Sequence, residues 1–387
     1  MVKIMETMIE SRFILAAGGT GGHLCPALSL ARALKKIQPE ADCLFVGAGR
    51  PVEAAIVDPA GFRRVVLRAG GWKGLSLRAR LKGLWQVWGG FREAIELIRS
   101  YRPRVCFGAG GYVTVPVGLA AWFLGVPLII HEQNSRAGLS NKLLGRLADH
   151  ICLGFEEAAP AFPVGRTVVT GNPVRPEIAA LHEQERSFDR RPPTVLVTGG
   201  SQGARALNMT AAPVLAELVR QGLAINIIHQ TGAADMDEVR RVYLEAGAEA
   251  EVKGFYQDMA ALYHRTDLVI GRAGAITLSE LAAARLPAVL VPLPTAADDH
   301  QTLNARFMEA AGAALVLPQA GLTRETLGTA LAGLLTSPEK LAGLSRAAAS
   351  LARLDADIRL AGLCLDLASA REPASSAGRL SSLLKML

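Results

Sequence analysis

Short apolar runs followed by longer helical patterns rich in Ala and Leu recur along the whole chain. In the first half the runs are FILAAGG, DCLFVGAG, RVCFGAGG, PLIIHE and HICLGF, and in the second half they are TVLVTGG, INIIHQTG, DLVIGRAG and PAVLVPLP. Uninterrupted apolar strands separated by helices are typical of parallel sheets covered on both faces and joined by right-handed crossovers. We therefore predict an α/β fold built from doubly wound parallel sheets.

The two halves of the chain resemble each other, which predicts two Rossmann-like domains facing a cleft. Gly18–Gly22 (GGTGG) ends the first strand of one half, Gly199–Gly203 (GGSQG) ends the first strand of the other, and a helix follows each. The length of 387 residues is sufficient for two such domains. We predict an N-terminal domain over 1–175, a C-terminal domain over 176–355, a helix at about 356–371 that is able to pack back on the N-terminal domain, and a loose tail over 372–387.

Composition excludes several classes of protein. Apolar residues make up 50% of the chain and charged residues 20%, which rules out a disordered chain. The five cysteines lie far apart without a C-x-x-C pair, so neither a disulfide framework nor a zinc site is indicated, and a reduced cytosolic compartment is favoured. Glu6 and Glu10 interrupt the place where a signal peptide needs an apolar stretch.

One uncharged segment, 113–130, reaches the length of a membrane span. The Gly125-Val126-Pro127 break divides it, however, and favours a buried helix to about Leu124 followed by a buried strand.

Four glycine-rich loops, at 18–22, 108–111, 199–203 and 271–274, come at the ends of strands. Such loops let backbone N–H groups approach an anion at the positive end of a helix, at the sheet edge where doubly wound folds bind ligands. A diphosphate or nucleotide ligand is therefore favoured. A Walker A loop is excluded because no Lys follows the final Gly of GGTGGH, and Leu24 breaks the dinucleotide pattern G-x-G-x-x-G.

The loop at 199–203 also satisfies the nucleophile-elbow pattern G-x-S-x-G. A Ser201 nucleophile would need a downstream acid and histidine, for instance Asp267 and His300. Thr20 takes the place of the serine in the matching first loop, which favours a shared phosphate-binding role over hydrolysis.

His23 directly follows the first glycine loop, so we expect it at the start of a helix. A histidine there can act as a base near neutral pH, since the positive helix end helps to keep it uncharged. Position alone leaves a second interpretation open, in which His23 only bonds to its own loop.

Five motifs together resemble the MurG family, the peripheral membrane N-acetylglucosaminyltransferases of peptidoglycan synthesis. They are Ala16–His23, Gly108–Val113, His131–Asn134, Gly171–Arg175 and Gly199–Ala204. The resemblance implies a GT-B fold and a role in cell wall biogenesis, cell shape and cell division. It also implies transfer of N-acetylglucosamine from UDP-GlcNAc to the C4 hydroxyl of the muramoyl sugar in lipid I, the undecaprenyl-linked muramoyl pentapeptide. The product would be lipid II, with a β-1,4 linkage and inversion at the anomeric carbon.

The resemblance also implies roles for individual residues. His23 is the expected catalytic base or acceptor-orienting group. The residues expected to bind UDP-GlcNAc are Thr20, Gly21, Gly22, Asn134, Arg175, Ser201, the backbone at Tyr256, the helix start Ala275, Ile276, Thr277, Leu278, Ser279 and Glu280 (with Glu280 on the ribose), and Gln301 on the sugar. The chain departs from the usual family pattern at Ala273 and Thr295, where Ser and His are common.

We expect no cofactor and no metal. Asp298–Asp299 has no partner ligands identifiable from the sequence. Helix ends and amides are able to stabilise the charge of the leaving UDP instead.

A basic, tryptophan-bearing segment predicts contact with an anionic membrane surface. No acidic residue occurs between Gly61 and Arg92, and a helix over 76–88 would place Leu77 with other apolar residues on one face. The residues predicted to form this membrane patch are Trp72, Lys73, Arg78, Arg80, Leu81, Lys82, Leu84, Trp85 and Trp88. The alternative is a core-facing helix with a solvated basic side. The net charge of +7 would also allow nucleic acid as a partner, but aromatic residues make up only 5% and no reader motif is present, so we expect none.

We therefore expect an enzyme at the cytoplasmic face of the inner membrane, with room for contacts to other cell-wall synthesis proteins. Two alternatives stay open: a catalytically inactive nucleotide-sugar-binding or scaffold protein, and another GT-B transferase or UDP-sugar epimerase. Another GT-B transferase or a UDP-sugar epimerase would share the glycine loops but lack the basic, tryptophan-bearing patch.

Overall fold

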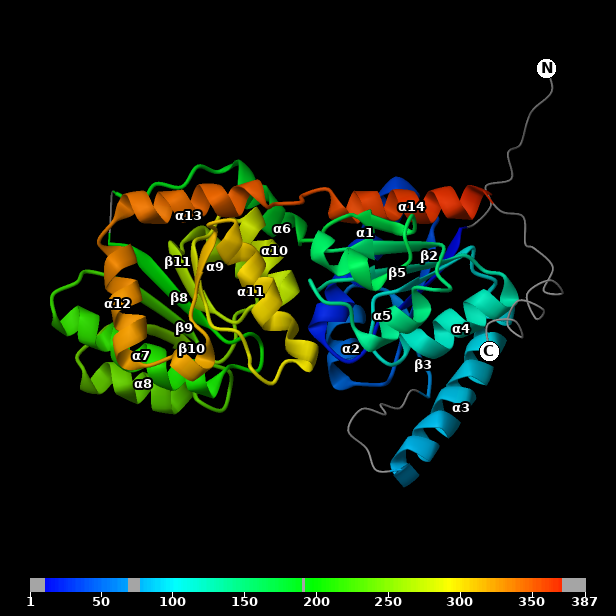
Figure 1. Ribbon diagram of the computed structural model, residues 1–387, viewed down its shortest axis with the longest axis horizontal. Helices are drawn as coiled ribbons and strands as arrows, with labels where there is room; N and C mark the ends of the chain where they lie inside the picture. Colours follow the sequence, from blue (N-terminus) through cyan, green and yellow to red (C-terminus); the bar gives the residue numbers. More distant parts are fainter. Residues whose placement is uncertain (1–10, 69–76, 190–191, 371–387) are drawn as a thin grey trace, which may run out of the picture. The chain divides into compact units, whose positions relative to one another are not determined.

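The computed structural model describes residues 11–68, 77–189 and 192–370 (Figure 1). The chain divides into two compact units. Unit 1 comprises Met1–Pro173 and Asp355–Leu387, and unit 2 comprises Val174–Leu354. Each unit is a parallel sheet with helices on both faces, as the alternating pattern predicts.

Unit 1, over its described residues, contains a seven-stranded sheet in the order β3-β2-β1-β4-β5-β6-β7, with every pair parallel. Its strands are β1 (Arg12–Ala16), β2 (Asp42–Gly47), β3 (Arg63–Val66), β4 (Val105–Gly108), β5 (Leu128–Glu132), β6 (His150–Leu153) and β7 (Thr167–Val169). Its helices are α1 (Gly21–Ile37), α2 (Pro51–Val57), α3 (Leu77–Tyr101), α4 (Thr114–Leu124), α5 (Leu139–Leu144) and α14 (Ala356–Ala370).

Successive side chains of β1 point to opposite faces of this sheet, and helices cover both faces. Phe13 and Leu15 point into a core formed with α1, α2 and α14, whereas Ile14 and Ala16 point into a core formed with α3, α4 and α5. The helix α14 returns from the end of the chain and packs along α1 (Figure 1).

Unit 2 repeats this topology with a six-stranded parallel sheet over its described residues, in the order β10-β9-β8-β11-β12-β13. Its strands are β8 (Thr194–Thr198), β9 (Asn226–Gln230), β10 (Glu251–Lys253), β11 (Leu268–Gly271), β12 (Ala288–Leu290) and β13 (Ala314–Val316). Its helices are α6 (Pro176–Ala179), α7 (Arg205–Arg220), α8 (Met236–Glu245), α9 (Met259–His264), α10 (Ala275–Ala283), α11 (His300–Ala310), α12 (Arg324–Leu335) and α13 (Pro338–Ser350). Val195 and Val197 of β8 face α7, α8 and α12, and Leu196 faces the core that includes α10 and α11.

The uncharged segment 113–130 is interrupted as predicted. It forms α4, which ends where Gly125 adopts a left-handed φ of 79°, and then the fully buried strand β5. Among the described residues, no helix is both long enough and apolar enough to span a membrane.

Candidate functional site

The first glycine loop leads from β1 directly into α1, and His23 is the third residue of that helix. This position confirms the expectation that His23 lies at a helix start. Its ring packs over the backbone of Gly110 and Gly111, which adopt φ values of 98° and 83°. A Cβ at position 110 would lie 3.0 Å from His23 Cε1, so the glycine there gives the imidazole its room.

The buried Gln133 connects His23 to His131. Its Oε1 lies 3.1 Å from His23 Nδ1, and its Nε2 lies 2.8 Å from the Ala109 carbonyl and 3.0 Å from His131 Nδ1. His131 Nε2 in turn lies 3.1 Å from the Gly171 carbonyl. Burial lowers the pKa of His131 to about 4, so its ring is neutral at physiological pH.

Two buried carboxylates organise the backbone around this histidine. Glu53 accepts hydrogen bonds from the N–H groups of Gly19, Ala48 and Gly49, and so ties the first glycine loop to the loop after β2. Glu132 accepts from the backbone and side-chain amides of Asn134, and also from Gly138 and Asn141. Both carboxylates hold loops in place.

Within unit 1, the predicted site residues come together at the carboxyl ends of β1 and β5. Thr20, Gly21 and Gly22 form the turn before His23, and Asn134 follows β5 two residues after Glu132. Thr20 and Gly22 are exposed, while Asn134 is half-buried. Their contacts with a donor sugar stay predictions.

In unit 2 the second glycine loop leads from β8 into α7 and packs backbone to backbone against the turn after β9. A Cβ on Gly203 would lie 1.9 Å from the Thr231 carbonyl oxygen, and one on Gly232 would lie 2.5 Å from the Gln202 carbonyl oxygen. Gln230 strengthens this contact by donating from Nε2 to the Gly200 carbonyl, at 3.2 Å. Its Oε1 accepts from the backbone N–H of Tyr256, at 3.0 Å. The loop carrying Ser201 is therefore tied to the segment around Tyr256.

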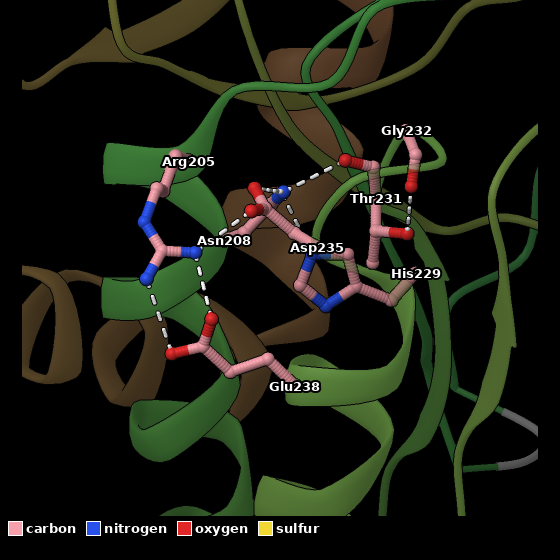
Figure 2. A network of polar contacts seen from close by, with 7 residues as sticks. All are labelled: Arg205, Asn208, His229, Thr231, Gly232, Asp235 and Glu238. Atoms are coloured by element: carbon pink, nitrogen blue, oxygen red, sulfur yellow. Dashed lines mark hydrogen bonds and ion pairs between the residues drawn. The ribbon is translucent and has the colours of Figure 1, made fainter.

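A polar network holds the turn after β9 in place (Figure 2). Asn208 on α7 donates from Nδ2 to the Thr231 carbonyl and to Asp235, both at 2.8 Å. Asn208 Oδ1 lies 3.2 Å from Nε2 of His229, whose pKa burial lowers to about 3. At the surface Arg205 bridges Asp235 and Glu238, with contacts of 2.8 and 2.7 Å.

The helix start predicted to bind the diphosphate belongs to α10, which begins at Ala275. Glu280, one turn further along, is buried and paired with Arg175. Arg175 Nε and Nη2 contact its Oε1 at 3.0 and 2.9 Å, and the Tyr263 hydroxyl lies 3.4 Å from its Oε2. Burial raises the pKa of Glu280, and the Arg175 charge opposes this effect. Two residues that the resemblance relates to the nucleotide thus contact each other.

The remaining residues that are predicted to bind UDP-GlcNAc lie elsewhere on unit 2. Ser201 is exposed on its loop, and Gln301, in the first turn of α11, accepts through Oε1 from the Leu293 N–H at 3.0 Å. Ile276, Thr277, Leu278 and Ser279 lie in the first turns of α10, where Ser279 donates to the Ala275 carbonyl.

The structure excludes the triad suggested for Ser201, Asp267 and His300. Ser201 follows the carboxyl end of β8, whereas Asp267 precedes β11, which runs parallel to β8 with Leu268 opposite Val195. Asp267 therefore lies at the amino edge of the sheet, where it accepts from the Thr194 N–H at 2.8 Å. Ser201 and Asp267 are separated by the length of a strand, so these two residues do not belong to one triad.

Of the predicted membrane patch, the structure describes only part. Its helix α3 begins at Leu77, close to the expected start, but continues to Tyr101 rather than ending near 88. Trp88 is 58% exposed, and its ring lies 5.7 Å from that of Phe91. Trp72 and Lys73 lie outside the described residues, as do the side chains of Arg78, Arg80, Leu81, Lys82, Leu84 and Trp85.

Two parallel α/β units, each with glycine loops and helix starts at the carboxyl edge of its sheet, are the architecture of the GT-B fold. Residues 13–153 match the glycosyltransferase family 28 N-terminal domain, and residues 194–359 match the glycosyltransferase family 28 C-terminal domain.

Relatives that match most of the chain identify the family within this class. The chain is 44% identical to a protein of Chromohalobacter salexigens, over 92% of this chain and 97% of the relative. That protein is named UDP-N-acetylglucosamine–N-acetylmuramyl-(pentapeptide) pyrophosphoryl-undecaprenol N-acetylglucosamine transferase. A protein of the same name from Acidithiobacillus ferrooxidans is 43% identical, with the same coverage. The crystal structure of Acinetobacter baumannii MurG superposes with a TM-score of 0.76 at 31% identity, over 92% of this chain and 99% of that one. The chain belongs to the MurG family of N-acetylglucosamine transferases.

Proposed function

We propose that this protein transfers N-acetylglucosamine from UDP-GlcNAc to the C4 hydroxyl of the muramoyl sugar of lipid I, giving lipid II with inversion at the anomeric carbon. One observation carries the proposal: relatives named for this transfer match 92% of the chain at 43 and 44% identity. We would not expect a scaffold protein or a more distant GT-B enzyme to match these relatives along both units.

In the proposed reaction His23 is the base. The acceptor O–H bond breaks as its proton passes to the imidazole, the oxygen bonds to the anomeric carbon, and the bond from that carbon to the diphosphate breaks with its electron pair leaving on UDP. A single displacement of this kind inverts the anomeric carbon. The position of His23 in the first turn of α1 favours the neutral ring that a base requires.

Unit 2 supplies the groups that would stabilise the leaving UDP. The free N–H groups in the first turn of α10, together with its dipole, suit a diphosphate. Glu280 already accepts from Arg175 and Tyr263, and a carboxylate has lone pairs left for a ribose hydroxyl. Arg175 fixes the direction of that carboxylate, so its loss should weaken donor binding.

The lipid-linked acceptor places the proposed reaction at the cytoplasmic face of the membrane, with the protein bound peripherally. The exposed indole of Trp88 and the absence of acidic residues from 61 to 92 support contact with anionic lipid. Cosedimentation with phosphatidylglycerol vesicles, compared with neutral phosphatidylcholine vesicles, tests this location.

Release of UDP from UDP-GlcNAc, with and without a short-chain lipid I analogue, tests the proposed transfer. We expect release that depends on the acceptor, that falls about 10²–10⁴-fold in His23→Ala, and that is unchanged in the exposed control His264→Ala. Saturable UDP-GlcNAc binding without release would favour the binding-protein alternative. Conversion of the donor without acceptor would favour an epimerase.

A further inference from the structure

The contacts of Gln133 determine which of its side-chain atoms faces His23. Its Nε2 lies within 2.8 Å of the Ala109 carbonyl oxygen and 3.2 Å of the His131 carbonyl oxygen. Carbonyl oxygens only accept hydrogen bonds, so the atom between them must be the NH₂ group. The other atom, which faces His23 Nδ1 at 3.1 Å, is therefore the amide oxygen.

His131 gives the same orientation independently. Its Nε2 lies 3.1 Å from the Gly171 carbonyl oxygen, which requires a proton on Nε2. The ring is fully buried and neutral, so its Nδ1 carries the lone pair and needs a donor. The Gln133 NH₂ group, 3.0 Å away, is that donor.

The orientation of Gln133 has a consequence for His23. An amide oxygen only accepts, so His23 Nδ1 must donate and must carry the ring proton. In neutral His23 the lone pair then lies on Nε2. A chain of bonds runs from the Gly171 carbonyl through His131 and Gln133 to His23, and its direction is set by carbonyl groups that cannot reverse.

We propose that Gln133 is a positioning residue that holds His23 in the Nδ1-protonated tautomer, so that Nε2 is the atom that accepts the proton of the acceptor hydroxyl. The catalytic part of this inference rests on the proposed transferase function, whereas the tautomer is a property of the protein alone. Because Gln133 is only 2% exposed and is anchored by Ala109 and His131, the amide cannot turn to follow a rotated imidazole.

The direct test is the protonation pattern of the His23 ring in the full chain labelled with ¹⁵N-histidine. Two-bond proton–nitrogen correlation spectra at neutral pH distinguish the two tautomers, and the His23→Ala spectrum assigns the signal. We expect a proton on Nδ1. A proton on Nε2 would overturn the proposal whether or not the chain is an active transferase. Nδ1 protonation in a chain without transferase activity would retain the positioning role and reject the proposed function.

Variants separate orientation from simple packing. Gln133→Leu keeps the volume but removes the acceptor, so we expect loss of the single tautomer. Its kcat should fall about 10- to 100-fold, less than the loss of the base itself, with KM for UDP-GlcNAc nearly unchanged.

Asn141→Ala is the matched control, because Asn141 bonds to the His131 carbonyl and Glu132 in the same segment but not to His23. It should lose comparable stability and keep the wild-type His23 signal. Retention of both tautomer and kcat in Gln133→Leu would contradict the proposal. If Gln133→Leu does not fold, the wild-type spectrum decides alone.

Discussion

Each unit has a buried histidine bonded to a side-chain amide near its first glycine loop, but the two arrangements serve different groups. In unit 1 the amide of Gln133 lies between buried His131 and His23, so the network ends on a side chain in the first turn of α1. In unit 2 the amide of Asn208 links buried His229 to the Thr231 carbonyl and to Asp235, so that network holds the backbone of the turn after β9. The first arrangement orients a titratable ring, and the second fixes the path of a loop.

The difference agrees with the two tasks in a glycosyl transfer. Proton removal requires one nitrogen at one place and in one protonation state. Binding a diphosphate requires several backbone N–H groups held in a fixed turn. The proposed function assigns proton removal to unit 1 and diphosphate binding to unit 2. The same α/β topology suits both, because the carboxyl edge of each sheet brings a loop, a helix start and a neighbouring strand end together.

Substituting the close-packed glycine of each unit should have the largest effect. Gly203→Ala would place Cβ 1.9 Å from the Thr231 oxygen at φ +75°, and Gly111→Ala would place it 2.6 Å from the Gly18 oxygen at φ +83°. We expect each to lower the free energy of unfolding by about 3–5 kcal/mol, measured by urea denaturation. Gly222→Ala, with a φ of +90° but open space around it, is the control and should cost about 1–2 kcal/mol. Equal losses in all three variants would show that the close contacts do not matter.

Removing the buried carboxylate of Asp235 from the unit 2 network should have the next largest effect on stability. Asp235→Ala leaves Asn208 Nδ2 without one acceptor in a buried place, and we expect a loss of about 2–3 kcal/mol of stability. Glu238→Ala removes only an exposed partner of Arg205 and should cost less than about 1 kcal/mol. A larger effect from Glu238 than from Asp235 would mean that the surface ion pair, rather than the buried part, stabilises the turn (Figure 2).

The two buried histidines predict a loss of stability in acid. Their pKa values fall from the ordinary 6.5 to about 4 for His131 and about 3 for His229, so the unfolded chain binds protons that the folded chain does not. Stability is therefore full above pH 6.5 and decreases as pH falls, by about 2 kcal/mol per histidine at pH 5. Urea denaturation at pH 7.5 and pH 5 measures this decrease. His229→Gln should show a smaller difference between the two pH values than the wild type, and an unchanged difference would refute the assignment.

The fold was predictable wherever strands are buried on both faces. Every strand expected from an apolar run is present, but β3, β7, β10 and β13 were not expected, and these are the four edges of the two sheets. An edge strand pairs on one side only. These four have three or four residues and are mostly half-buried or exposed, as in RRVV and EVK, so they lack the apolar run on which the prediction relied.

The location of the site could be predicted from the sequence, but the contacts between its side chains could not. Glycine loops indicate the carboxyl edges of the sheets, and His23 lies where its loop predicts. The partnership between His23 and Gln133 joins residues 110 positions apart, and that between Asn208 and His229 joins residues 21 apart, which no local pattern encodes. A histidine near the end of a largely apolar strand, as in LIIHE and NIIHQ, is the local signal from which these networks could have been inferred.

The contrast between the two networks is tested most directly by steady-state kinetics of Gln133→Leu and Asn208→Ala in one acceptor-dependent UDP-release assay. Gln133→Leu should lower kcat and leave KM for UDP-GlcNAc near its wild-type value, because only the base is misoriented. Asn208→Ala should mainly raise that KM, because the Thr231–Gly232 turn no longer holds the second glycine loop. The same pattern of kcat and KM in both variants would contradict the division of roles between the units.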